Sequence, residues 1–107
     1  MTTHYKTRVN KVLAGSDEKF LDAYGNRSGL MIASLSGNAQ TAYIRFNAPG
    51  DTTVPTATNF DMFIEKGERL VFTGLGTPQN EVWIAGNAGD RIAVLDDNPG
   101  GSSSSGY

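Results

Sequence analysis

Residues 81–95 read EVWIAGNAGDRIAVL, two runs of alternating apolar residues that a turn cluster separates. Alternation with a period of two predicts β-strands, and residues that tolerate tight or left-handed backbone predict turns. The segments TAYIRFN (41–47) and FDMFIE (60–65) repeat the pattern. The chain is therefore predicted to be all-β, since no stretch of it shows sustained helical periodicity.

The same alternation of strands and turns along the rest of the chain predicts a single small antiparallel β-sandwich, or jelly-roll-like, domain of about eight short strands. The expected strands span residues 8–13, 18–23, 29–35, 41–47, 60–65, 68–73, 80–85 and 90–96. Lys66 and Gly67 lie between two alternating runs and predict a hairpin turn. Residues 16–25 also fit a two-turn helix with Ser16 as its N-cap, but the neighbouring strands favour a strand or an irregular segment there.

Three segments divide the 107 residues: a basic N-terminal arm (1–11), the β-sandwich domain (12–97) and a low-complexity tail (98–107). The arm carries Lys6, Arg8 and Lys11 and no acidic residue. The tail, NPGGSSSSGY, can bury little besides its final tyrosine. The proline-containing loop 48–59 is long for a β domain, and loops of this kind commonly bind or form interfaces.

The predicted strands are apolar on both faces. Alternation assigns these residues to one face: Leu30, Ile32, Ile44, Phe46, Met62, Ile64, Leu70, Phe72, Val82, Ile84, Ile92 and Val94. It assigns these to the other: Met31, Leu35, Tyr43, Phe63, Val71, Trp83 and Leu95. A two-layer domain needs to bury only one face of each sheet. We therefore expect other copies of the chain to cover the second face.

Composition excludes several classes of partner. The formal net charge of −2 is too balanced to favour nucleic acid or an acidic membrane surface. The chain has no cysteine, which rules out disulfides and thiolate metal sites. Because it shows neither a signal-peptide pattern nor a stretch that approaches a membrane span, we expect it to be made in a cytoplasm without being secreted.

No set of residues in the sequence forms a catalytic constellation. His4 is the only histidine and lies in the predicted arm, where it lacks the fixed geometry that proton transfer needs. No other histidine is available to activate the candidate nucleophiles Ser16, Ser28, Ser34 and Ser36. The acidic residues around 17–22 and 96–97 lack the spacing of a cation site and are expected to be solvated turn acids. The sequence predicts neither an enzyme nor a metal or cofactor site.

Two aromatic residues leave an alternative open. Tyr43 and Trp83 fall on the same nominal face, where they fit either an interface or a platform for a sugar ring. Few basic residues accompany them, which argues against a nucleic-acid base as the stacking partner.

The order of short motifs between residues 27 and 96 points to a family. The motifs are Arg27-x-x-Leu30-x-Ile32-x-Ser34-x-Ser36, Ala42-Tyr43-Ile44, Gly67-Glu68-x-Leu70, Val82-Trp83-Ile84-Ala85 and Arg91-Ile92-Ala93-Val94-Leu95. This order resembles the small β-sandwich modules of tailed-phage virions, most of all the capsid decoration (cement) proteins.

The resemblance implies a jelly-roll-like homotrimer that binds the major capsid protein on the outside of a phage capsid and stabilises the shell. It implies that the arm residues Lys6, Arg8 and Lys11 contact the capsid. Together with the apolar pattern, it gives an expected oligomer interface of Tyr43, Phe63, Trp83, Met31 and Leu35. The expected location is the capsid surface of the virion. The alternative is a tail or fibre module that binds a cell-surface glycan.

Overall fold

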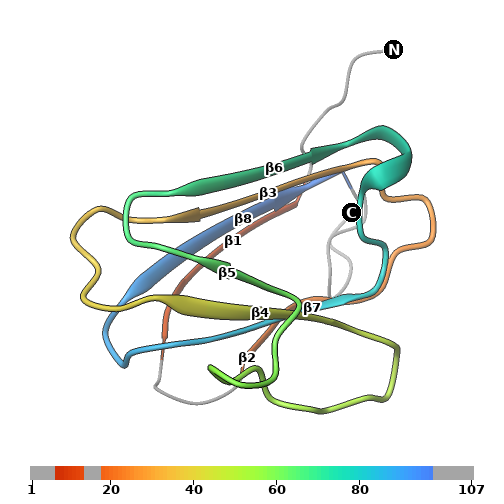
Figure 1. Ribbon diagram of the computed structural model, residues 1–107. Helices are drawn as coiled ribbons and strands as arrows, with labels where there is room; N and C mark the ends of the chain where they lie inside the picture. Colours follow the sequence, from red (N-terminus) through yellow and green to blue (C-terminus); the bar gives the residue numbers. More distant parts are fainter. Residues whose placement is uncertain (1–6, 14–17, 98–107) are drawn as a thin grey trace.

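The computed structural model describes residues 7–13 and 18–97, and this part of the chain forms eight strands (Figure 1). They are β1 (Thr7–Val12), β2 (Glu18–Leu21), β3 (Gly29–Ser34), β4 (Ala42–Asn47), β5 (Met62–Ile64), β6 (Arg69–Thr73), β7 (Glu81–Ala85) and β8 (Arg91–Asp96). A short 3₁₀ turn, η1 (Gly74–Gly76), follows β6. All eight predicted strands are confirmed to within two residues at each end. The segment 16–25, whose sequence also fits a two-turn helix, contains strand β2.

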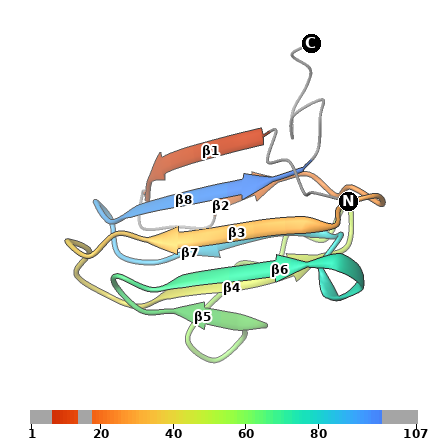
Figure 2. The same cartoon turned by 90° about the horizontal axis from the view of Figure 1, so that it is seen from above.

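The strands form two antiparallel sheets of four. Sheet A has the order β1-β8-β3-β6 and sheet B the order β2-β7-β4-β5. Figure 2 shows sheet A from above, with β1 and β6 at its two edges. The pairs β1–β8, β2–β7, β3–β6 and β4–β5 are those of a long hairpin folded over on itself, which is the strand arrangement of a jelly roll. The predicted fold class, an antiparallel β-sandwich, is confirmed.

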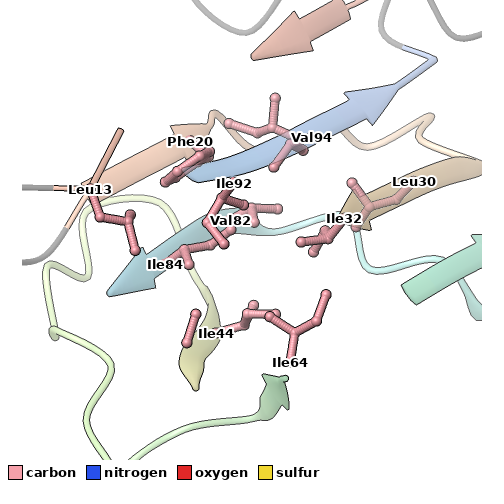
Figure 3. Close-up of a cluster of buried hydrophobic side chains, with 12 residues drawn as sticks. Leu13, Phe20, Leu30, Ile32, Ile44, Ile64, Val82, Ile84, Ile92 and Val94 are labelled. Atoms are coloured by element: carbon pink, nitrogen blue, oxygen red, sulfur yellow. The ribbon is translucent and has the colours of Figure 1, made fainter. Parts of the chain in front are cut away.

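The core lies between the two sheets. Figure 3 shows side chains of both sheets meeting there, for example Ile32 and Ile92 from sheet A with Ile44 and Ile84 from sheet B. All twelve residues that alternation assigned to the first face either belong to this buried cluster or pack against it. Strands favour β-branched residues at such positions because these side chains pack well on a pleated surface.

The prediction of a hairpin at Lys66 and Gly67 is wrong in one respect. A tight turn is present: the amide of Glu68 donates to the carbonyl of Glu65 at 3.0 Å, and Gly67 has a φ of 79°. However, β5 pairs with β4 in sheet B, whereas β6 pairs with β3 in sheet A. The turn therefore carries the chain from one sheet to the other, because both flanking runs place apolar residues in the shared core.

The boundary of the predicted arm also changes. β1 begins at Thr7 and pairs with β8 from Thr7–Asp96 to Val12–Arg91. Arg8 and Lys11 are therefore strand residues of the sandwich rather than part of an arm. Lys6, His4 and Ser16 lie outside the described residues, as does the tail 98–107.

Candidate functional site

The second apolar face of the sequence analysis is in fact two faces on opposite sides of the molecule. Met31, Leu35, Val71 and Leu95 belong to the outward side of sheet A, which we call face A. Tyr43, Phe63 and Trp83 belong to the outward side of sheet B, which we call face B. The five predicted interface residues thus cannot form one continuous contact surface.

Face A is apolar across all four strands. One cross-strand row runs Arg8–Leu95–Met31–Val71, and the next runs Asn10–Ala93–Ala33–Arg69. Val12 and Val71 are each 56% exposed, and Leu35 is 42% exposed. A hollow of about 260 Å³ lies at one end of the face, between Val12, Leu35 and Arg91. A single chain therefore leaves a broad apolar surface uncovered on this side.

The charges on face A have one sign. The outward positions of its four strands include Arg8, Arg69 and Arg91 and no carboxylate. One residue beyond β8, Asp97 accepts hydrogen bonds from the backbone amide and the hydroxyl of Ser28. The face consequently offers arginine donors among apolar side chains, a composition typical of protein interfaces.

Face B is partly covered by its own chain. Trp83 lies in a cross-strand row between Lys19 and Arg45, and its indole nitrogen donates to Glu81 Oε1 at 2.8 Å. It is only 8% exposed in the single chain. Little of Trp83 is therefore left for a partner to contact. The long loop between β4 and β5 lies on the same face.

That loop runs along face B beneath the lower sheet of Figure 1, on the side away from sheet A. Arg45 on β4 anchors it: its guanidinium donates to Asn59 in the loop and lies 3.6 Å from the carboxylate of Asp51. Asn47, also on β4, donates to the carbonyl of Thr53 at 2.9 Å. The chain thus covers part of the surface that we expected other copies to cover.

The loop also completes an aromatic cluster at the β5 edge of face B. Tyr43 and Phe63 are cross-strand partners, and Phe60 from the end of the loop stands against both rings. Phe60 is 37% exposed and Phe63 is 48% exposed. A hollow of about 270 Å³ opens between these rings, and Thr41, Ala57 and Glu65 complete its lining. Sequence reasoning included Phe60 in the expected strand 60–65 but did not name it as a site residue; in the structure it precedes β5 and packs against Tyr43 and Phe63.

A buried ion pair joins three segments at one end of the sandwich. The guanidinium of Arg27 donates to Asp96 Oδ2 at 3.0 Å and to the carbonyls of Asp22, Pro78 and Asn80 at 2.7 to 3.0 Å. The side chains of both Arg27 and Asp96 are fully buried. The expectation that Asp96 is a solvated turn acid is therefore wrong. Because Arg27 makes four hydrogen bonds and neither side chain is exposed, the pair has a structural role.

Polar side chains also fasten the β3–β4 loop to the start of β8. Asn38 donates to the carbonyl of Arg91 and accepts from its amide, both at 2.7 Å. The carboxylate of Asp90 accepts from the amides of Ala39 and Gln40, and these bonds, first that from Ala39, lower the pKa of Asp90 below its ordinary value. This network likewise fixes loop geometry and leaves no open reactive group.

The residues predicted to contact a capsid have different environments. The Nζ of Lys11 donates to the carbonyl of Lys19 at 3.0 Å and lies 4.9 Å from the centre of the Phe20 ring. Arg8 instead points outward on face A, beside Leu95. Of the two described residues, only Arg8 therefore belongs to an exposed surface of the sandwich.

Within residues 7–13 and 18–97, no group of three or more histidine, cysteine or acidic side chains is placed to hold a metal ion. The described part of the chain contains no helix long and apolar enough to cross a membrane. Comparison with protein-family models, with curated proteins and with solved structures finds no match to this chain. The candidate sites therefore rest on the geometry of face A and of the aromatic hollow.

Proposed function

We propose that the protein is a non-enzymatic structural component of a tailed-phage virion, which forms a homotrimer and binds the major capsid protein on the outside of the capsid. Face A is the observation that carries the proposal. In a single chain it leaves Leu35 and Val71 exposed and Met31 and Leu95 partly exposed, and contiguous apolar surfaces of this kind mark interaction sites.

Apolar burial is the main driving force in this account, at roughly 25 cal/mol per Å² removed from water. The arginines of face A restrict how the copies can be arranged around one another. A two-fold contact of face A with itself would bring Arg8, Arg69 and Arg91 of both copies into one interface with no carboxylate from either face's strands to pair them. In a head-to-tail arrangement, face A meets a different surface of the next copy, so the arginines of two copies do not meet. Such an arrangement can close into a ring such as a trimer.

Binding to the shell follows from the same geometry. A trimer presents every capsid-binding element three times, so weak individual contacts combine into strong attachment. The proposal keeps the expectation from the sequence that Lys6, in the residues before edge strand β1, contacts the shell. Jelly rolls also occur among viral capsid domains, which supports the proposal by analogy of fold alone.

The test of capsid binding uses the purified chain and phage capsids from which this protein is missing. We expect the chain to co-sediment with such capsids and to raise the temperature at which they break open. Val71→Asp removes an apolar contact at a position that is 56% exposed, so the domain stays folded while co-sedimentation is lost. The control is Val54→Asp in the β4–β5 loop, which keeps binding. Failure of the wild-type chain to co-sediment at any ratio contradicts the proposal.

A further inference from the structure

We propose that the aromatic hollow at the β5 edge of face B binds one neutral pyranose ring of a glycan. This inference is independent of the proposed function, because the hollow lies on sheet B and the assembly surface on sheet A.

The three rings around the hollow are held in place by the chain itself. The centres of Tyr43 and Phe60 lie 5.3 Å apart, and those of Phe60 and Phe63 lie 5.9 Å apart in an edge-to-face arrangement. Such pairs stabilise each other beyond the area that they bury. The rings nevertheless stay partly exposed, so they offer an ordered apolar surface to a ligand without first having to rearrange.

Two polar side chains also line the hollow. The hydroxyl of Thr41 donates to the carboxylate of Glu65, and these residues lie two positions from Tyr43 and Phe63 along the chain. Thr56 and Asn59 close a tight turn through reciprocal backbone hydrogen bonds of 3.0 and 3.1 Å, and this turn holds Ala57 at the rim. The hollow therefore combines an apolar floor with hydroxyl and carboxylate groups at its edge.

This combination selects a class of ligand. A pyranose has a face of C–H groups that packs on aromatic rings, and a rim of hydroxyls that both donate and accept hydrogen bonds. A wholly apolar ligand would desolvate Glu65 without a hydrogen bond in return. A nucleotide would stack equally well but would bring its phosphate toward that carboxylate.

The size of the hollow also favours a single sugar ring as the ligand. The volume of about 270 Å³ is at the lower limit of small-molecule pockets, which begin at roughly 300 Å³. A stable protein partner would cover about 800 Å² on each side, far more than a hollow bounded by six residues offers. The site therefore fits one sugar ring, and the remainder of a glycan would extend into solvent.

The experiment is a titration of the ¹⁵N-labelled full chain with methyl β-D-glucopyranoside and, separately, methyl β-D-galactopyranoside, followed by amide chemical shifts. We expect saturable shifts at Thr41, Tyr43 and Ala57 with at least one probe, at a Kd on the order of 1 to 10 mM. Phe60→Ala weakens binding by about ten-fold or more, since it removes the ring that contacts both of the others. Val71→Ala on face A leaves the affinity unchanged.

Phe63→Trp is the control in case an alanine variant loses its fold. It keeps an aromatic surface at the same position and should bind the glycoside at least as tightly as the wild-type chain. The proposal is overturned if neither glycoside shifts these amides, or if Phe60→Ala and Phe63→Ala bind as the wild-type chain does. It is also overturned if Phe60→Ala keeps its fold but lowers the oligomer mass, since the hollow would then be a contact between copies. Loss of capsid binding in Val71→Asp with glycoside binding retained leaves the inference intact, so the two proposals fail separately.

Discussion

Arg27 is a charged side chain that the fold holds out of water. Its guanidinium donates to one carboxylate, at the end of β8, and to three backbone carbonyls in the loops that precede β3 and β7. A buried charge is tolerated only when it is paired and hydrogen-bonded. Arg27 thereby fixes the relative positions of segments that are far apart in the sequence.

Removal of Arg27 is expected to destabilise the domain strongly. Arg27→Met takes the guanidinium away from the buried carboxylate of Asp96, and breaking a buried pair in this way costs about 3 to 5 kcal/mol of unfolding free energy. Asp96→Asn costs less, because the amide oxygen still accepts from Arg27 Nε and the three carbonyl bonds remain. Urea unfolding followed by circular dichroism measures both values. Equal losses of unfolding free energy in the two variants would show that the hydrogen bonds from Arg27 to the three carbonyls do not contribute to stability.

Asp90 makes the stability of the domain decrease at low pH. Its folded pKa lies below the unfolded value of 3.8, because the amides of Ala39 and Gln40 hydrogen-bond the charged form. The native state then binds fewer protons, so this contribution is present above the unfolded pKa and is lost as the pH falls through the folded pKa. We predict that from about pH 5 downward the wild-type chain loses stability more steeply than Asp90→Asn in urea titrations. Parallel curves for the two proteins would contradict this.

At the scale of elements, the β4–β5 loop has two roles. It covers part of face B through its contacts with Arg45, and it supplies Phe60 to the aromatic hollow. Its anchors are the contacts of Arg45 with Asp51 and Asn59 and that of Asn47 with Thr53. Long loops with these properties commonly form binding sites on a rigid scaffold.

The single tryptophan of the chain reports on this loop directly. The double variant Asp51→Ala/Asn59→Ala removes two partners of Arg45, the cross-strand neighbour of Trp83, without altering the strands. The loop and the Arg45 side chain should then lose their fixed positions, and the indole should become more exposed. We expect acrylamide quenching of Trp83 fluorescence to rise roughly two-fold or more as this local unit opens. Thr58→Ala, at the tip of the turn, is the matched control. Unchanged quenching in the double variant means that other groups cover Trp83.

The elements also show what can be predicted from sequence. Alternation located all eight strands and the core, since the period of two follows directly from strand geometry. It did not locate partners: the runs on either side of Lys66 and Gly67 fit a hairpin as well as a crossing between sheets. Strand pairing in this fold is mostly between segments distant in the sequence, and a local pattern carries no information on such contacts.

The candidate sites were predictable to a smaller degree, for the same reason. Tyr43 and Phe63 were identified as outward residues, and they do meet across β4 and β5. Phe60 joins them only because the loop folds back over the sheet. The burial of Asp96 likewise depends on its tertiary contact with Arg27, which no spacing rule predicts.

At the scale of the whole molecule, the sandwich separates two outward faces by its core. Face A is broad, apolar and carries arginines, while face B is half covered by a loop and ends in an aromatic hollow. This separation allows one chain to assemble through one side and to contact a further ligand through the other. We propose that face A is the surface through which copies of the chain associate.

Sedimentation velocity of the wild-type chain beside Val71→Asp and Val54→Asp tests that claim most directly. The account predicts that the wild-type protein and Val54→Asp sediment as a trimer of 11.4 kDa chains, whereas folded Val71→Asp sediments as a monomer. The circular dichroism spectrum of each variant verifies its fold, because both positions are at least 36% exposed. A monomeric wild-type chain, or a Val71→Asp variant that remains a trimer, would contradict the account.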